Sequence, residues 1–242
     1  MLSETPWKMD AVMLLGSRIF FCLFATVSVG LGLEYFLPNL PVGERQFYNF
    51  LASSLGFHGM TLVLVTPFLR FHTTNWSRFL GLDRARWLRI LWWGVGSSAA
   101  LVPVELGLNH LATQAILWLQ MTPEYQPTIK VLQVSVSTWQ RVCFGTAAIA
   151  LAPVSEEVLF RGILYPVVKQ IGHPHLAVFG TSLLFAAIHS NLMTFLPLFV
   201  FSLVMIWLYE RTDTLAVPIL AHALFNAANF TLFFFEPQWR AG

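Results

Sequence analysis

The sequence is poor in charged residues. Only 11% of its 242 residues are Asp, Glu, Lys or Arg, whereas 56% are hydrophobic. A soluble globular domain carries roughly 25% charged residues, so the composition argues against a soluble protein. The mean hydropathy of +0.65 points instead to a membrane protein. The net charge of +2 is too small to indicate a nucleic-acid partner, and none is expected.

Cysteine is also scarce. Cys22 and Cys143 are the two cysteines, and because both lie in apolar stretches no disulfide is expected. A cleaved secretory signal is not expected either. Asp10 and Arg18 interrupt the first apolar stretch, and no small-residue cleavage site follows it. We therefore expect this stretch to be retained as a membrane span.

Long apolar runs fill most of the chain. Because a spanning helix needs about 20 apolar residues, the runs predict an all-α, polytopic transmembrane helical bundle of about eight spans. We expect one integral membrane domain over residues 1–242. The predicted spans are residues 10–37, 48–70, 88–120, 138–154, 157–171, 175–190, 193–210 and 214–236. Pro153 separates the fourth span from the fifth, and Gly172 and Pro174 mark the following turn.

Basic residues in short loops predict the orientation. The connection 70–89 carries the most arginines, so it is predicted to be cytoplasmic. With eight spans, both termini, the segment around residue 155 and the 190–193 turn lie on the same side. Arg45, Lys130 and Arg211 then lie on the other. We expect a multi-pass plasma-membrane protein with cytoplasmic N- and C-termini, and the compact chain without organelle signals favours a bacterial source.

Ionisable residues inside spans are costly and therefore indicate function. The first group follows Pro153, where Ser155 is predicted to cap a new helix. Glu157 and Arg161 are four residues apart, so they share a helix face and can form an ion pair. Glu156 points about 100° away from Glu157, which leaves its carboxylate free for chemistry. A capped helix start with a surface ion pair is an equally good interpretation of this group alone.

Two further polar groups lie in later spans. His189 ends an apolar helix, on the side of the membrane where Glu156 is predicted to begin its own. His222 and Asn226 share one face of an apolar helix, where polar groups need partners. The alternatives are an interfacial histidine and a pair that holds neighbouring helices together. The other buried polar candidates lack a motif and are interpreted as structural: Glu34, Glu105, His58 and His110.

Together, these groups have the parts of a hydrolytic site. A carboxylate beside an imidazole activates water as a general base, and a second imidazole and an amide can stabilise an oxyanion. Glu156, His189, His222 and Asn226 thus predict peptide-bond hydrolysis without a covalent intermediate. The first three are also possible zinc ligands, although the HExxH pairing of zincins is absent. We expect no cofactor, with a divalent metal such as zinc as the alternative. Serine catalysis is disfavoured because no GxSxG elbow is present.

Three motifs carry a resemblance to a known family. In chain order they are Glu156-Glu157-x-x-x-Arg161, Phe185-x-x-x-His189 and His222-x-x-x-Asn226. They resemble the signature motifs of the CAAX-protease and bacteriocin-processing family, which includes the type II CAAX prenyl endopeptidases. The resemblance covers about residues 150–230, the motif-bearing core of the predicted domain.

The resemblance implies an intramembrane endopeptidase that cleaves a membrane-associated protein or peptide, with or without a lipid modification, near the cytoplasmic leaflet. In this family, the residue matching Glu156 activates water and His189 positions it or shares its proton. His222 and Asn226 would stabilise the oxyanion. Glu157 and Arg161 would support Glu156, and Arg161 is also a candidate for a substrate carboxylate.

Two other classes of function compete with this one. A catalytically idle scaffold or immunity protein of the same family would keep the bundle without turnover, but the intact motifs favour an enzyme. A proton-coupled transporter is typically built from paired repeats with broken helices at matching positions, and the sequence shows no such pairing. The expected partners are a protein or peptide substrate and membrane lipids.

Overall fold

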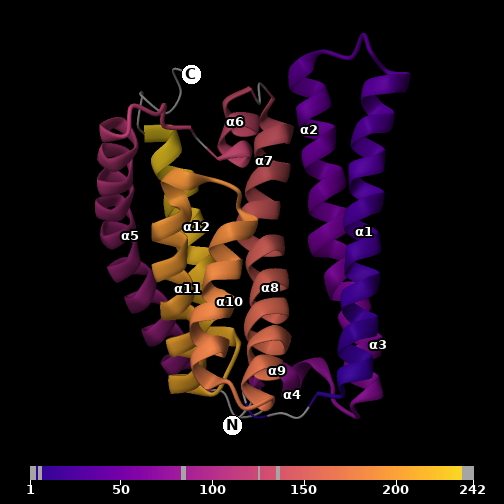
Figure 1. The fold of residues 1–242 in the computed structure, drawn as a ribbon, viewed down its shortest axis with the longest axis vertical. Helices are drawn as coiled ribbons and strands as arrows, with labels where there is room; N and C mark the ends of the chain where they lie inside the picture. Colours follow the sequence, from indigo (N-terminus) through magenta and orange to yellow (C-terminus); the bar gives the residue numbers. More distant parts are fainter. Residues whose placement is uncertain (1–3, 5–6, 83–85, 125, 135–136, 236–242) are drawn as a thin grey trace.

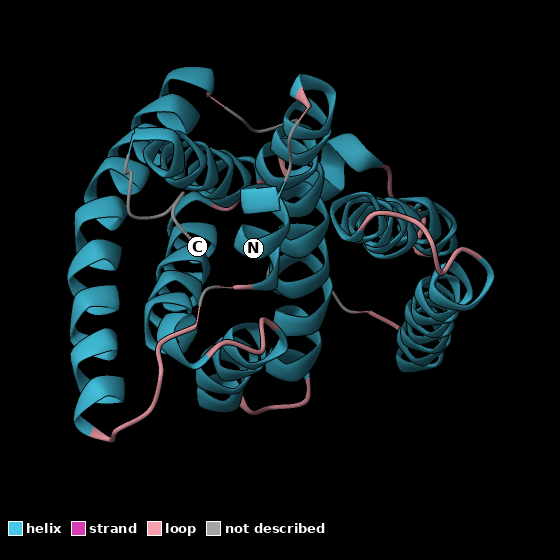
Figure 2. Cartoon of the chain, turned by 90° about the horizontal axis from the view of Figure 1, so that it is seen from above, coloured by secondary structure: helices cyan, strands magenta, loops and turns pink. Residues whose placement is uncertain are grey.

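The computed structural model describes residues 4, 7–82, 86–124, 126–134 and 137–235. Throughout this part of the chain the regular elements are helices, with no strand (Figures 1 and 2). This confirms the prediction of an all-α helical bundle. The first half contains α1 (Met9–Phe36), α2 (Val42–Ser53), η2 (Ser54–Gly59), α3 (Met60–Phe71), α4 (Trp76–Leu80) and α5 (Trp87–Trp118). The second half contains α6 (Pro127–Val134), α7 (Thr138–Thr146), η4 (Ala147–Leu151), α8 (Ala152–Glu157), η5 (Val158–Leu164), α9 (Tyr165–Gln170), α10 (Pro174–Ile188), α11 (Leu192–Thr212) and α12 (Ala216–Phe235).

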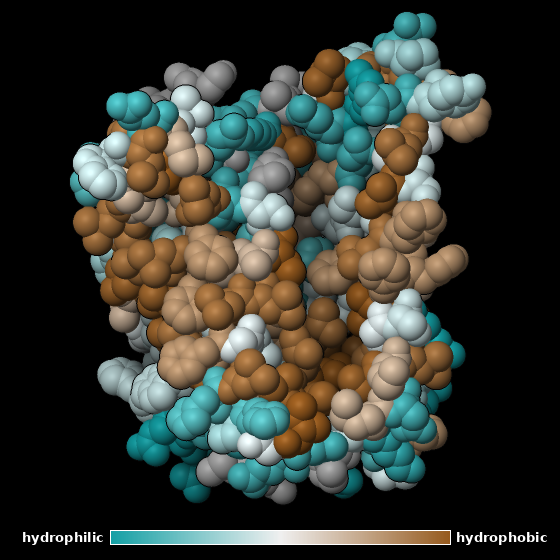
Figure 3. Space-filling view, in the orientation of Figure 1, coloured by the Kyte–Doolittle hydropathy of each residue, from teal (hydrophilic) through white to brown (hydrophobic). Residues whose placement is uncertain are grey.

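Six of the described helical segments are long and apolar enough to cross a membrane. They are Met9–Phe36, Val42–Phe71, Trp87–Trp118, Thr138–Gln170, Leu192–Thr212 and Ala216–Phe233, and the apolar α10 is shorter. Large apolar side chains on the outer faces suit contact with lipid: Phe20 is 71% exposed and Trp92 is 78% exposed. On the face seen in Figure 3, a band of apolar residues lies across the middle of the molecule, between polar ends. The chain is an integral membrane protein.

The predicted break at Pro153 is wrong. Residues Thr138–Gln170 form one helical segment of 33 residues, so the two spans predicted at 138–154 and 157–171 are a single span. Pro153 is tolerated because it follows η4, a π-helical segment whose wider turn accommodates the missing N–H donor. Ser155 is no N-cap: it lies inside the helix, and its hydroxyl donates to the carbonyl of Ala152 at 3.0 Å.

This merged span changes the predicted topology. Arg89 Nη2 donates to the carbonyl of Arg211 at 3.1 Å, so Arg211 lies beside the 70–89 connection and not across the membrane from it. We call this side the basic end. It carries Lys8, Arg70, Arg78, Arg86, Arg89, Lys169 and Arg211. The 190–193 turn was predicted on the side of the 70–89 connection but lies at the opposite end of the bundle. There Asn191 Nδ2 donates to the carbonyl of Glu124, which follows the C-terminal end of α5.

The two described ends of the chain are also separated. Trp7 bonds Gln170 at the basic end, whereas Phe233 packs with Phe144 and Leu132 at the other. α1 therefore begins and α12 ends at opposite ends of the bundle (Figure 1), and the prediction that both ends share a side does not hold for the described residues. The predicted cytoplasmic Arg240 lies outside the described residues. One miscounted span accounts for this difference, since every later segment changes side with it.

Candidate active site

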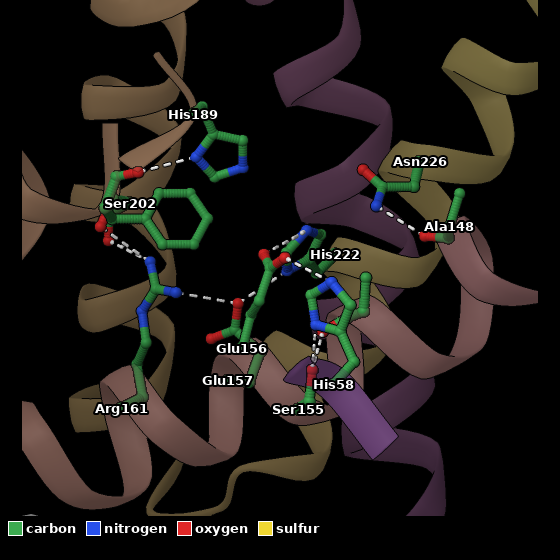
Figure 4. A network of polar contacts seen from close by, with 12 residues as sticks. His58, Ala148, Ser155, Glu156, Glu157, Arg161, His189, Ser202, His222 and Asn226 are labelled. Carbon is green, nitrogen blue, oxygen red and sulfur yellow. Dashed lines mark hydrogen bonds and ion pairs between the residues drawn. The ribbon is translucent and has the colours of Figure 1, made fainter. Parts of the chain in front are cut away.

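Glu156 lies near the middle of the Thr138–Gln170 span, and its side chain is flanked by two imidazoles (Figure 4). His58 Nε2 is 4.0 Å from Glu156 Oε1, and His222 Nε2 is 3.8 Å from Oε2. Both distances exceed those of a hydrogen bond, about 2.7–3.2 Å, so Glu156 is near both rings without a direct bond. The residue is 8% exposed. It is thus a nearly buried carboxylate between two potential proton carriers.

His222 is oriented by the second glutamate of the pair. Its Nδ1 lies 2.8 Å from Glu157 Oε1. Because a carboxylate only accepts hydrogen bonds, Nδ1 carries the proton and donates it to Glu157. The ring then presents Nε2 toward Glu156. Phe201 packs against the same ring at 4.8 Å between centroids and restricts its rotation.

Glu157 and Arg161 form the predicted ion pair, but in the core instead of at a surface. Arg161 Nη1 donates to Glu157 Oε1 at 2.9 Å, and the side chains are 1% and 0% exposed. Arg161 Nη2 donates to the carbonyl and the hydroxyl of Ser202 on α11 at 3.1 and 2.8 Å. The guanidinium also lies 4.8 Å from the ring centroid of Phe185 on α10. In this buried position Arg161 is not accessible to a substrate carboxylate, and it connects three helices around the site.

His189 reaches the site through Phe185, the first residue of its motif. Its Nδ1 donates to the Phe185 carbonyl at 2.7 Å, which leaves Nε2 without that proton. The Phe185 ring is fully buried and lies 4.9 Å from the ring of His189 and 6.2 Å from that of His222. His189 is near enough to His58 for the two imidazoles to interact electrostatically. The motif spacing of four therefore places Phe185 between His189 and the buried Arg161.

Asn226 is held by a carbonyl that the π-helical turn leaves open. The N–H of Ala152 donates to the carbonyl of Ala147, five residues back. In the same register the carbonyl of Ala148 would pair with residue 153, but proline has no N–H. Asn226 Nδ2 donates to this carbonyl at 2.8 Å instead. Pro153 thus leaves free the carbonyl that fixes the amide of Asn226. The second hydrogen of that amide has no partner among the described residues.

His58 is the site residue that sequence reasoning missed. It lies in η2, and its Nδ1 is 2.6 Å from Ser155 Oγ, 97 residues further along the chain. The sequence signal for His58 is an imidazole within an apolar span, and because no motif includes His58 this signal alone favours a structural interpretation. Ser155 itself is 1% exposed, so it is not available as a nucleophile.

The other structural candidates lie outside this cluster. Glu105 accepts a hydrogen bond from Asn109 at 3.0 Å, and Glu34 pairs with Arg45 at 3.9 Å on an exposed side chain. His110 is exposed. A cavity of about 390 Å³ lies at the basic end, and its lining does not include the residues of the cluster: Gly81, Arg86, Arg89, Ile90, Thr212, Asp213, Thr214 and Val217.

The proposed metal ligands do not fit a zinc site in this arrangement. Among the described residues, no three His, Cys, Asp or Glu side chains come close enough to hold a metal ion together. Glu156 and His222 face each other at 3.8 Å, but no comparably short distance joins His189 to either. A structural or catalytic zinc site needs at least three protein ligands at about 2.0–2.3 Å, and Glu156, His189 and His222 do not provide such a set in this arrangement.

Comparison with known proteins agrees with the motifs. Residues 138–228 match the family model described as "Type II CAAX prenyl endopeptidase Rce1-like". This segment contains all three motifs, so the match falls on the part of the chain that carries the resemblance. The kind of function that it indicates is that of a CAAX-type intramembrane protease.

A relative of the chain is known in a bacterium. "Uncharacterized protein YpbD" of Bacillus subtilis (strain 168) is 29% identical over 144 residues, which cover 58% of this chain and 67% of that protein. No solved structure matches the chain. His58 lies outside the segment that matches the family model, so its place in the cluster comes from the fold alone.

Proposed function

We propose that the chain is an intramembrane endopeptidase in which Glu156 activates the water that hydrolyses a peptide bond. The observation that carries this proposal is a nearly buried carboxylate without a direct hydrogen bond, flanked at 3.8 and 4.0 Å by imidazoles from two other helices. A carboxylate used only for structure is normally paired in such a position, as Glu157 is.

The residues support a two-stage hydrolysis. Glu156 takes a proton from water as the water oxygen bonds to the carbonyl carbon, and the electron pair of the carbonyl moves to its oxygen. The free amide hydrogen of Asn226 donates to that oxyanion, and His222 adds a second donor when its Nε2 carries a proton as well as Nδ1. Glu156 then returns the proton to the amide nitrogen as the C–N bond breaks. His189 positions the water or shares its proton, while Glu157 and Arg161 hold His222 and the helices in place.

The position of Glu156 suggests where a substrate is cut. The 33-residue span is about 50 Å long at about 1.5 Å per residue, and Glu156 lies about 3 Å from its midpoint toward the basic end. We place the basic end in the cytoplasm by the positive-inside rule. The substrate would then be a membrane-associated protein or peptide whose scissile bond enters the bilayer half facing the cytoplasm. Figure 3 shows a hollow between the α1–α2 side and the C-terminal helices through which such a chain can approach.

A cleavage assay tests the proposal. The wild type, Glu156→Gln and His189→Ala are purified in detergent and incubated with a quenched fluorescent peptide library, with and without lipidated members. Loss of a general base or its partner lowers rates by about 10²–10⁴-fold, and we expect losses in this range. His110→Gln, which changes an exposed histidine, is the control. Equal cleavage by wild type and variants would overturn the assignment, and a folded wild type that cleaves no peptide would favour the scaffold alternative.

A further inference from the structure

We propose that His58 is an additional catalytic residue, which holds the second hydrogen of the water that Glu156 activates. This inference rests on the proposed function, but it concerns a residue outside the Rce1-like segment. It begins from the position of His58 in η2, where the imidazole reaches across to α8 and contacts two consecutive residues, Ser155 and Glu156.

The proton on the His58 ring follows from its partner. Ser155 has one hydroxyl hydrogen, and it donates this hydrogen to the carbonyl of Ala152 at 3.0 Å. Toward His58 the hydroxyl oxygen must therefore accept, so the proton of the neutral ring lies on Nδ1, 2.6 Å from Ser155 Oγ. The Nε2 atom consequently presents a lone pair toward Glu156.

A lone pair facing a carboxylate requires a hydrogen donor between them. His58 Nε2 and Glu156 Oε1 are 4.0 Å apart, too far for a direct bond but suited to a single bridging water. A water about 2.8 Å from both atoms would subtend an angle of about 90°, close to the angle between its own hydrogens. It would donate one hydrogen to Glu156 and the other to His58, and its lone pairs would point away from both.

This arrangement orients the bridging water for nucleophilic attack. With both hydrogens held, the free lone pairs of the water are directed away from Glu156 and His58, toward the space where a carbonyl carbon must lie. As the O–C bond forms, Glu156 accepts one proton, and His58 retains its hydrogen bond to the resulting hydroxyl group. His222 faces the other carboxylate oxygen at 3.8 Å, so the two imidazoles occupy different sides of Glu156. His58 is partly exposed, whereas His222 is buried, and so water can enter from the His58 side.

Two substitutions separate this role from a structural one. Asparagine places its amide where Nδ1 lies, so His58→Asn keeps the contact with Ser155 but removes the group facing Glu156. Glutamine reaches the position of Nε2, so His58→Gln keeps a hydrogen-bond acceptor for the water but loses the contact with Ser155. Both variants are compared with the wild type on one peptide that the wild type cleaves from the library, with thermal unfolding in detergent as the folding control.

We expect His58→Asn to lower kcat at least 30-fold with KM within about threefold of the wild type, because aiming water belongs to general-base catalysis. His58→Gln should lose less than 10-fold. If His58→Asn keeps wild-type kcat while Glu156→Gln is inactive, His58 only connects two helices and the inference is wrong, although the proposed function stands. If Glu156→Gln is fully active, the proposed function fails instead.

A second measurement is independent of substrate. Nitrogen-15 spectra of histidine-labelled wild type and His58→Asn identify the ring signals of His58 by difference. The expected signals are a protonated Nδ1 and an unprotonated Nε2. A proton on Nε2 would overturn the inference, because that nitrogen could then no longer accept the second hydrogen of the water.

Discussion

The buried ion pair between Glu157 and Arg161 provides a quantitative test of the fold. Arg161→Met removes the guanidinium and leaves the carboxylate of Glu157 in the core with His222 as its partner. Removing one partner of a buried pair costs about 3–5 kcal/mol, because the remaining charge stays desolvated. The pair is suited to this reasoning because both side chains are almost fully buried and 2.9 Å apart.

Thermal unfolding of the purified protein in detergent measures this cost. For a chain of about this size, 1 kcal/mol shifts Tm by about 2–4 °C, so Arg161→Met should lower Tm by about 6–20 °C. The exposed pair of Lys130 and Glu124 is a matched control, since its N–O distance is 2.8 Å but its side chains are 50% and 68% exposed. Lys130→Met should leave Tm unchanged within error, because solvent screens such pairs.

The double variant distinguishes lost pairing from lost packing. Glu157→Gln with Arg161→Met removes both charges, so it should recover at least about 1 kcal/mol relative to Arg161→Met alone. A Tm of Arg161→Met within 2 °C of the wild type would refute the reasoning. A double variant no more stable than the single one would show that packing, and not the unpaired charge, accounts for the loss.

Three further outcomes are expected. Gly162→Ala should lower Tm because its new Cβ would collide with the Phe79 ring, an overpacking cost of about 1–3 kcal/mol. Gly96→Ala, with open space around the new Cβ, should not lower Tm. The hydrogen bond and charge of Lys130 hold the pKa of Glu124 below its ordinary value, so Glu124 should protonate at lower pH in the wild type than in Lys130→Met, as read by carboxyl NMR. Chelator treatment should leave peptide cleavage intact; a stoichiometric metal whose removal abolishes cleavage would contradict the Glu156-water proposal.

Features that depend on nearby residues were predictable from the sequence. Apolar runs revealed the helical membrane bundle, because a spanning segment must be apolar over its whole length. The pair of Glu157 and Arg161 was also predictable, since residues four apart share one helix face. Its burial was not, because the prediction placed Glu157 at the start of a helix near the membrane surface. In the structure it lies inside a longer span.

The span count failed for a physical reason at Pro153. A proline in a helical pattern usually ends or kinks the helix, so the pattern predicted two spans where the structure has one. The π-helical segment before Pro153 removes the expected clash, but no sequence pattern near Pro153 predicts a π-helical segment. The carbonyl left open at Ala148 is satisfied by Asn226, 78 residues later. Such a compensation depends on tertiary contact, which single-sequence reasoning does not contain.

His58 shows the same limit at the candidate site. Its partner Ser155 is 97 residues away, and no motif includes either residue. An imidazole in an apolar span is costly wherever it occurs, so the sequence marked His58 as unusual but did not indicate a partner. His189 and His222 belong to motifs, so the sequence identifies them as site candidates. His58 belongs to no motif, and only the packing of η2 against α8 places it beside Glu156.

The π-helical segments connect these observations. The described chain contains three, η2, η4 and η5, and each supplies one part of the cluster: His58, the carbonyl of Ala148, and Arg161. A π turn has weaker hydrogen-bond geometry than an α turn, and it persists where function or packing maintains it. His58 lies beside Glu156, the Ala148 carbonyl holds Asn226, and Arg161 holds Glu157, the residue next to Glu156. Three such segments contributing to one polar cluster are hard to explain by bundle stability alone, since α-helical turns would pack an inert core at lower cost. It therefore favours a site built for chemistry at Glu156 over a scaffold that has retained its motifs by descent.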